Sequence, residues 1–424
     1  MAIAGAMFRR TFASLGVRNY RLYFIGQVVS VTGTWMQSTA QMWLVLHLTG
    51  SALALGLTTA LQFAPMLVLG IWGGVLADRV DKRRLLYVTQ SAAGLLAAGL
   101  AVLTFSGRIE LWMVYGFAVA LGLVTAIDNP ARQSFVIEMV GPGQVSNAVS
   151  LNSTVFTGAR VVGPALSGLV IALYGTAWCF AFNAVSYIAV IIALALIRSE
   201  GFQRSRPLAR APGQVVDGLR HALGRPELRT PLLVLLVIGT FSFNFSVLLP
   251  LIARNTFHGD ARTYGLLFSV MGLGSLAGAL VSASRQRPTQ RLIVGSAVAF
   301  GALLLVAASA PTLLLEMAVL IPLGAAMITF QATTNAWLQM NTDGAFRGRV
   351  MALYMVAFVG STPIGGPLIG FVAQQLGPRF ALGVGGAAAL IAGGMGALLF
   401  RRTRSRKAKE VPRVFPVPEL DRPL

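Results

Sequence analysis

Residues 74–85 read GVLADRVDKRRL and separate two long apolar stretches of the chain. The flanking stretches, residues 51–77 and 85–106, are each long enough to cross a membrane as a helix, which takes about 20 predominantly apolar residues. Two aspartates and four basic side chains lie between them, where a membrane protein leaves the lipid and meets water. The run therefore predicts a short charged loop joining two membrane helices.

Further apolar runs extend outward from this pair in both directions. The composition agrees with them, because 55% of the residues are hydrophobic and only 11% are charged, against about 25% charged in soluble domains. We therefore predict an all-α integral membrane protein with twelve transmembrane helices. The predicted spans cover residues 22–47, 51–77, 85–106, 111–139, 145–173, 177–197, 229–255, 262–284, 290–310, 312–338, 348–376 and 379–400.

The basic residues predict the orientation. The chain has a net charge of +20, and 28 of its 34 lysines and arginines fall in alternate connecting segments and at the termini. Cytoplasmic loops carry such an excess, so both termini are predicted to be cytosolic in a multi-pass cell-membrane protein. The same placement fits anionic lipid headgroups as the partner of the positive charge, and a nucleic acid is not expected.

The longest connecting segment divides the spans into six and six. Short matches, GPALSG at 163–168 and GPLIG at 366–370, lie about one half of the spans apart and favour two pseudo-symmetric halves. The predicted organisation is a cytosolic N-terminal segment 1–21, a six-helix half 22–197, a central cytosolic loop 198–228, a six-helix half 229–400 and a cytosolic, disordered tail 401–424.

The fifth predicted span carries a glycine and proline pattern. Gly158, Gly163 and Gly168 allow close helix packing, and Pro164 removes a backbone donor inside the span. The pattern predicts a helix that packs closely and bends, and a proline-kinked packing helix is the alternative.

Charged residues inside predicted spans are rare and mark functional sites. Asp128 and Arg160 lie about 18 and 24 Å from the hairpin between the fourth and fifth spans, at 1.5 Å per residue. We therefore predict a buried Asp128–Arg160 pair with Arg132, four residues from Asp128, on its cytosolic side. The pair could be a static structural contact or could change during function.

Polar residues at helical spacing predict a small-molecule cavity. Amide and hydroxyl groups recur on one face of the first span, and a Phe-rich run in the seventh span contains further amides. The phenylalanines could equally face lipid. The candidate cavity residues are Gln27, Ser30, Thr34, Gln37, Gln41, Asn244, Gln331 and Asn335.

Signatures of enzyme chemistry are missing from the sequence. It contains no phosphate-binding G-x-x-x-x-G-K-[ST] loop and no G-x-S-x-G elbow. Three scattered histidines and one cysteine do not build a metal site. We expect no catalytic residues, no metal and no cofactor.

The loop at 74–85 resembles the cytosolic signature G-x-L-a-D-r-x-G-r-r of the major facilitator superfamily. Asp81 departs from the pattern, which has glycine there. The resemblance implies a gating role for the loop. Residues that match the signature are Gly74, Leu76, Ala77, Asp78, Arg79, Lys82 and Arg83.

Four further runs resemble the branch of this superfamily that contains enterobactin exporters and macrolide efflux proteins: DNPARQSF (128–135), NAVSLNS (147–153), ARVVGP (159–164) and RGRVMALY (347–354). The resemblance implies secondary active export of a drug-like or siderophore-like molecule by alternating access. Coupling to protons, with Asp128 as a carrier, or to another ion stays open. An importer and a lipid-modifying membrane enzyme are the alternatives.

Overall fold

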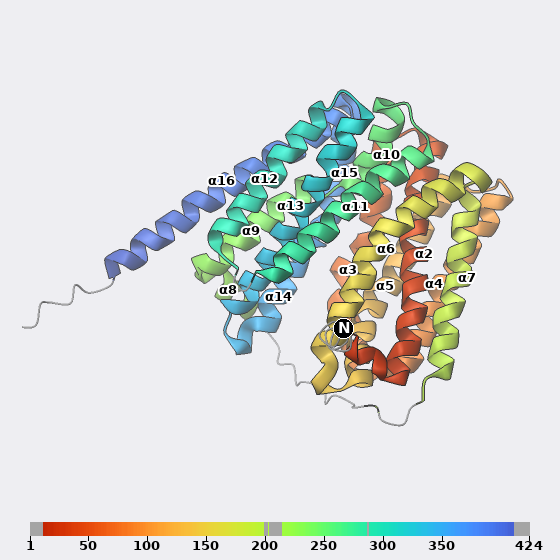
Figure 1. The fold of residues 1–424 in the computed structure, drawn as a ribbon, viewed down its shortest axis with the longest axis horizontal. Coiled ribbons are helices and arrows are strands. Elements are labelled where there is room, and N and C mark those ends of the chain that lie inside the picture. Colours follow the sequence, from red (N-terminus) through yellow and green to blue (C-terminus); the bar gives the residue numbers. More distant parts are fainter. Residues whose placement is uncertain (1–11, 199–201, 203–213, 286–287, 411–424) are drawn as a thin grey trace, which may run out of the picture.

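The computed structural model describes residues 12–198, 202, 214–285 and 288–410 (Figure 1). Every regular element within these ranges is a helix. The chain forms two helical bundles, one from the red to yellow part of Figure 1 and one from the green to blue part.

The first bundle contains six long helices, preceded by the short η1 (Ala13–Gly16). They are α2 (Arg18–Thr49), α3 (Ala52–Arg79), α4 (Lys82–Phe105), α5 (Leu111–Val140), α6 (Val145–Tyr174) and α7 (Thr176–Leu196), with η2 (Pro142–Gln144) between α5 and α6.

The second bundle follows the central segment. Its helices are α8 (Gln214–Gly224), α9 (Pro226–Phe241), α10 (Phe245–Leu251), the π-helical η3 (Ile252–Thr256), α11 (Ala261–Ser284), α12 (Gln290–Ser309), α13 (Leu313–Met340), α14 (Gly344–Phe358), α15 (Thr362–Leu376) and α16 (Pro378–Glu410).

The membrane spans agree with the sequence prediction. Among the described residues, 11 helical segments are long and apolar enough to cross a membrane. The remaining predicted span is α2, which is 32 residues long. Its glutamines, serines and threonines lower its mean hydropathy, so composition alone does not select it. The all-α fold is thus confirmed, with α2 as the most polar of the twelve predicted spans.

Two spans of the second bundle are interrupted, which the sequence did not predict. The seventh span breaks between α9 and α10, and the eleventh between α14 and α15. The breaks lie together, since a Cβ on Gly239 would stand 2.5 Å from Ser361 Oγ. At the first break the Asn244 side chain donates to the Thr240 carbonyl (2.8 Å) and so competes with the helical hydrogen bonds.

Helical structure also extends further than predicted. The central segment contains α8, and α16 continues to Glu410, into the stretch for which disorder was predicted. Residues 411–424 and most of the central segment before α8 lie outside the described residues.

Two antiparallel glycine-lined crossings join the bundles. In the first crossing, Gly56 of α3 lies against α15, and Gly370 of α15 lies against α3. A Cβ on Gly370 would stand 2.7 Å from the Ala52 carbonyl oxygen of α3. In the second, a Cβ on Gly168 of α6 would stand 2.7 Å from the Ala261 carbonyl oxygen of α11. Such crossings are possible only where side chains are absent.

Both crossings lie toward the end of the molecule that the basic residues predict to face outward, here called the outer end. In Figure 1 the two bundles meet at the top of the view, where α10 and α15 lie, and their ribbons diverge toward the bottom. Helix α10 fills the junction and contacts α2, α3, α11 and α15.

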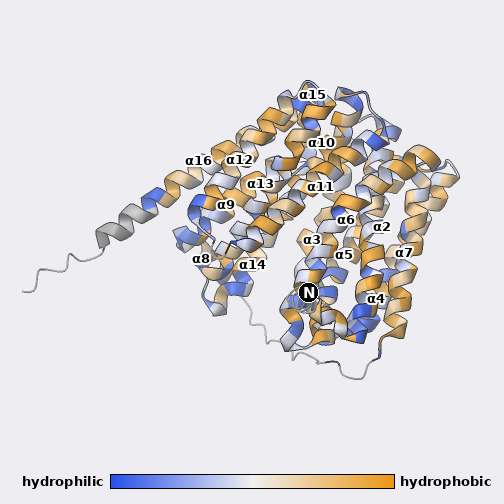
Figure 2. Cartoon of the chain, viewed as in Figure 1, coloured by the Kyte–Doolittle hydropathy of each residue, from blue (hydrophilic) through white to orange (hydrophobic). Residues whose placement is uncertain are grey.

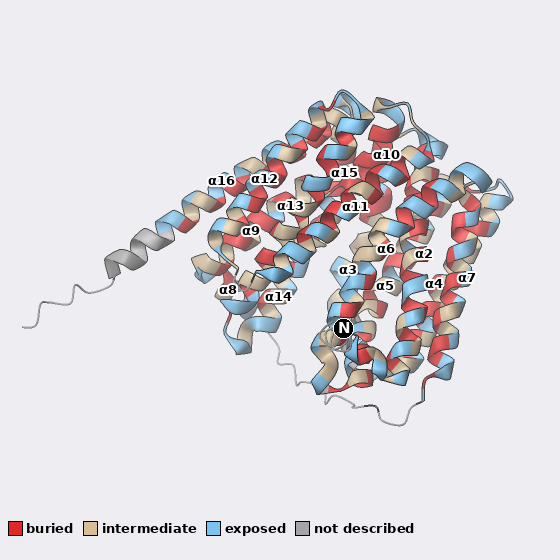
Figure 3. Ribbon diagram, in the orientation of Figure 1, coloured by how far each residue is buried: buried red, intermediate tan, exposed pale blue. Residues whose placement is uncertain are grey.

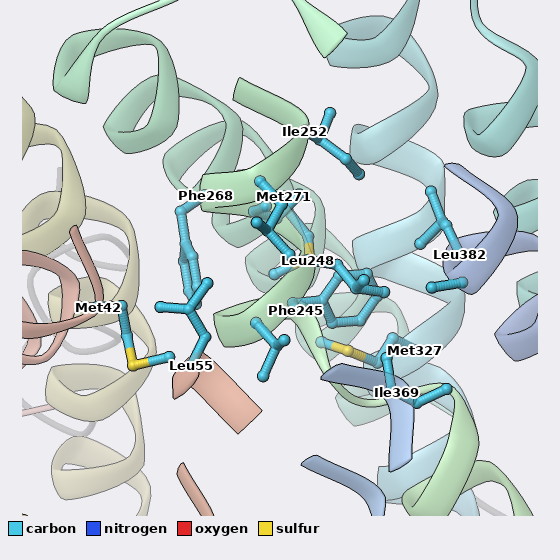
Figure 4. Close-up of a cluster of buried hydrophobic side chains, with 14 of the residues drawn as sticks. Met42, Leu55, Phe245, Leu248, Ile252, Phe268, Met271, Met327, Ile369 and Leu382 are labelled. Atoms are coloured by element: carbon cyan, nitrogen blue, oxygen red, sulfur yellow. The ribbon is translucent and has the colours of Figure 1, made fainter. Parts of the chain in front are cut away.

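The junction around α10 is an apolar core (Figure 4). Phe245 and Leu248 of α10 are almost fully buried, and they belong to one cluster with Leu55 of α3, Phe268 of α11 and Ile369 of α15. The cluster therefore contains side chains from both bundles.

Large apolar side chains also cover the outside of the helices. Trp72, Leu95 and Leu314 are 71%, 73% and 77% exposed. Figure 2 shows apolar residues over much of the helical surface, and Figure 3 shows that the buried faces point into the bundles. A surface of this kind is typical of a protein surrounded by lipid.

Candidate functional site

A polar network lies inside the first bundle, centred on Asp128 of α5. Its Oδ1 accepts hydrogen bonds from Thr89 Oγ1 (2.7 Å) and Gln90 Nε2 (2.8 Å) of α4. Its Oδ2 accepts from Arg132 Nε (3.1 Å) and forms a short ion pair with Arg132 Nη2. Arg132 Nη1 donates to Gln27 Oε1 of α2 (2.7 Å). The network links three helices, and the charges of Asp128 and Arg132 compensate each other.

The predicted pairing of Asp128 with Arg160 is wrong in this structure. Asp128 pairs with Arg132, because residues four apart on a helix share a face. The prediction compared depths in the membrane and did not account for the direction in which each helix points its side chains. Arg160 instead lies on α6 with its guanidinium carbon 5.6 Å from the centre of the Trp35 ring of α2.

Arg160 has no carboxylate partner among the described residues. Its Nε atom is buried and donates to no protein atom there, while the residue as a whole is half-buried. Its position is near the middle of α6, about 21 Å along the helix axis from Tyr174. Within the described part of the first bundle, the charge of Arg160 thus has no opposite charge beside it near the middle of the span.

Most of the predicted polar face of α2 is turned into the first bundle. Gln27 binds Arg132, Gln37 Oε1 accepts from Asn183 Nδ2 of α7 (2.7 Å), and Ser30 and Gln41 are buried. Gln41 Nε2 has no partner among the described atoms. Thr34 is exposed and lies 3.4 Å from the Tyr187 hydroxyl. The structure therefore leaves Thr34 as the accessible member of this set.

The candidates of the second bundle are spread over two places. Asn244 is buried at the break before α10. Gln331 and Asn335 lie half-buried on α13, where Asn335 Oδ1 accepts from Gln339 Nε2 (2.6 Å). They do not form one hydrogen-bonded cluster with the α2 residues.

The charged segment 74–85 holds the first bundle together at its inner end. Only Val80 and Asp81 lie between the helices, because α3 continues to Arg79 and α4 begins at Lys82, so the loop is shorter than predicted. Asp81, the departure from the family pattern, accepts from the Arg84 backbone nitrogen (3.0 Å) and caps α4, with φ of −57°. No left-handed conformation, which favours glycine, is needed there. Lys82 Nζ pairs with Glu138 Oε1 of α5 (2.6 Å).

Arg83 binds the carboxyl end of α7 through the carbonyl oxygens of Leu194 (2.9 Å) and Ala195 (3.2 Å). Arg79 is exposed. Gly74 and the Asp78 side chain lie outside the residues whose surroundings the structure describes, and the predicted gating role of the loop stays a prediction.

The glycines of α6 have separate surroundings. Gly163 faces α2, where a Cβ would stand 2.5 Å from Trp35 Cβ, and Gly168 faces α11. A Cβ on Gly158 would meet nothing within 4 Å. Helix α6 runs without a break through Pro164. Two of the three predicted glycines are therefore packing positions, and only Gly168 packs on the other bundle.

Sequence reasoning missed Thr89, Gln90 and Asn183, which supply partners to the buried polar groups. The sequence could have pointed to them, because each is a polar residue inside an apolar span. Trp35 was also missed, and nothing in its sequence position distinguishes it from an aromatic residue facing lipid.

The chain is similar to known proteins over most of its length. A family model described as transmembrane secretion effector matches residues 9–424. A staphyloferrin A transporter of Staphylococcus aureus is 26% identical over 367 residues, 84% of this chain and 90% of that protein. The multidrug efflux pump Tap of Mycolicibacterium fortuitum is 26% identical over 84% of this chain and 89% of its own. The enterobactin exporter EntS of Citrobacter koseri is 25% identical over 88% and 90%.

Solved structures share the fold at low identity. A bacterial homologue of the lysosomal transporter Spinster, in an inward-facing conformation, has a TM-score of 0.74 at 14% identity and covers 91% of this chain and 98% of that one. A bacterial homologue of the iron transporter ferroportin has a TM-score of 0.68 at 15% identity, with 90% and 98% covered.

Proposed function

Because the chain belongs to the transmembrane secretion effector family of the major facilitator superfamily, we propose that it exports a small organic molecule across the cell membrane by alternating access. The single observation that carries the proposal is the placement of the contacts between the bundles. The two glycine-lined crossings and the α10 cluster all lie toward one end. Two bundles joined at one end can rock about a central site.

The orientation predicted from lysine and arginine assigns that closed end to the outside. On this proposal the structure is an inward-facing state, in which a cytosolic substrate enters between the diverging ends of the bundles. Opening would separate α3 from α15 and α6 from α11 and would expose the apolar cluster around α10. Both termini are cytosolic in this arrangement.

Export is favoured over import by the relatives, two of which are an enterobactin exporter and a multidrug efflux pump. A drug-like or siderophore-like molecule is accordingly the proposed cargo. An importer of the same fold is the alternative, because the direction depends on the driving gradient and not on the fold.

The buried polar contacts of the first bundle support a structural role for the residues that make them. Asp128, Arg132 and Gln27 tie α5 to α2, while Lys82 and Arg83 tie α4 to α5 and α7. We assign these residues to holding the first bundle as one rigid unit. The gating role of Asp78 and Arg79 rests on the resemblance of the loop.

Proton coupling is the proposed source of energy, and Glu316 replaces Asp128 as its candidate. The Asp128 carboxylate accepts four hydrogen bonds, two of which come from Arg132. Glu316 of α13 is 1% exposed, and its Oε1 accepts no hydrogen bond from the described residues.

Accumulation assays test the proposed function directly. Cells with and without the gene are exposed to a chemical panel that includes antibiotics, dyes and siderophores. We expect lower accumulation of at least one compound in expressing cells, and recovery of accumulation when the proton gradient is collapsed. Higher accumulation in expressing cells would instead favour the importer.

A further inference from the structure

We propose that Arg160, with the ring of Trp35 behind it, binds an oxyanion of the transported molecule, so that the substrates are organic carboxylates. The proposal rests on the proposed transport function and names the substrate class. Its basis is an arginine in mid-membrane whose charge the described protein does not neutralise.

Arg160 differs from four arginines elsewhere in or beside the spans. Each of four others donates to a protein oxygen: Arg83, Arg132, Arg254 and Arg379. An arginine with a purely structural role in the membrane is expected to find such acceptors, because an unpaired charge there is costly. Arg160 has only the face of an indole ring, which attracts a cation without neutralising it.

The interior charges of the first bundle lead to the same conclusion. Asp128 is paired with Arg132, and Glu138 is paired with Lys82. Among the described side chains of this bundle, the two buried carboxylates are therefore paired, and Arg160 has no acidic counterpart there. A ligand with a negative charge would neutralise the Arg160 guanidinium.

The planar geometry of the Arg160 guanidinium favours a carboxylate as the bound anion. A guanidinium is planar and presents parallel N–H donors that match the two oxygens of a carboxylate. The half-buried side chain leaves donors accessible, and Trp35 offers an apolar surface for the rest of an organic acid. The mid-span position lies far from the headgroup level, which argues against a lipid phosphate as the occupant.

The site also lies where the bundles touch. A Cβ on Gly272 of α11 would stand 3.2 Å from the Arg160 carbonyl oxygen, and Ser269 Oγ of α11 donates to the Val161 carbonyl (2.7 Å). Trp35 packs against Phe268 of α11, with 6.0 Å between ring centres. An anion bound at Arg160 would therefore lie beside a contact that changes when the bundles rock.

The test uses matched probes that differ only in charge. Purified full-length protein in phosphatidylcholine nanodiscs is titrated with benzoate, naphthalene-2-carboxylate and adipate, and with the corresponding carboxamides. At least one acid is expected to bind roughly tenfold or more tightly than its amide, the discrimination expected of a hydrogen bond to a charged group. Because these bilayers contain no anionic lipid, displacement of an anionic headgroup from the protein cannot explain tighter binding of the acid than of the amide.

Three variants localise the effect. Arg160→Gln is expected to bind acid and amide equally, and Arg160→Lys to retain part of the preference as a point charge. Arg108→Gln removes the same charge from an exposed loop position and is expected to keep the full preference. Since Arg160 has no hydrogen-bonded or acidic partner among the described residues, Arg160→Gln leaves no buried charge without its counter-charge there and should fold, which its melting temperature checks.

The proposal is overturned if no acid binds the wild type, if amides bind as tightly as acids, or if Arg160→Gln keeps the preference. Failure of the transport proposal has a different signature. In that case cells with and without the gene accumulate all compounds equally, while the acid preference in nanodiscs and its loss in Arg160→Gln remain.

Discussion

At the scale of single residues, the sequence indicated which charges matter but not how they pair. The membrane position of Asp128, Arg132 and Arg160 follows from the apolar runs around them. Which of the two arginines reaches Asp128 depends on helix rotation, which depth along the chain does not determine. The i,i+4 spacing of Asp128 and Arg132 was the better guide.

Removing Arg132 should destabilise the first bundle strongly. Arg132→Ala leaves Asp128 buried without its counter-charge, and breaking a buried pair from one side costs about 3–5 kcal/mol. We expect a sharp fall in folded yield and in apparent melting temperature, measured by size exclusion and thermal unfolding in detergent.

Two comparisons complete this test. The double variant Asp128→Ala/Arg132→Ala should recover much of the yield, since both charges are gone. Arg160→Ala should reduce stability far less than Arg132→Ala. Equal losses in the two single arginine variants would contradict the pairing described for Asp128.

Glu316 should carry the coupling ion if protons drive transport. Glu316→Gln keeps the size of the side chain but cannot release a proton, so uptake into everted vesicles driven by a pH gradient should be lost. Exchange of substrate without a gradient should continue. Glu110→Gln changes an exposed carboxyl at the outer end and serves as the control. Gradient-driven uptake by Glu316→Gln at the wild-type rate would remove this residue from the coupling path.

At the scale of helices, hydropathy predicted the elements well. Most predicted ends lie within four residues of those observed, because lipid-facing helices must be apolar along their length. The breaks in the seventh and eleventh spans could not be predicted in the same way. The two breaks lie side by side at Gly239 and Ser361, which are 122 positions apart in the sequence, and hydropathy carries no information about such a long-range approach.

The α6–α11 crossing should set the conformational balance. A side chain at Gly168 would meet the Ala261 carbonyl oxygen, so Gly168→Leu should prevent closure of the outer end and reduce transport several-fold. Gly158→Leu is the matched control, because that position on the same helix faces open space. Transport and membrane abundance are measured together. Equal effects of the two substitutions would show that the crossing is not a special contact.

At the scale of the whole molecule, the orientation predicted from basic residues can be checked by labelling. The single native cysteine, Cys179, is buried and can be replaced by serine. In that background, cysteines at Arg108 and Gln375 should react with a membrane-impermeant maleimide added to intact cells, whereas one at Met340 should react only after permeabilisation. The reverse pattern would invert the topology and make the closed end cytosolic.

The central claim is that the two bundles rock about a central site, so that the outer crossings open as the inner ends of the bundles close. Double electron–electron resonance measures it, with one spin-label pair at the outer end (Arg108 and Gln375) and one at the inner end (Val80 and Met340). We predict that Gly168→Leu lengthens the outer distance and shortens the inner one relative to the cysteine-substituted parent, and that Gly158→Leu changes neither. Distances that stay fixed in Gly168→Leu, or that lengthen together at both ends, would contradict alternating access by rocking.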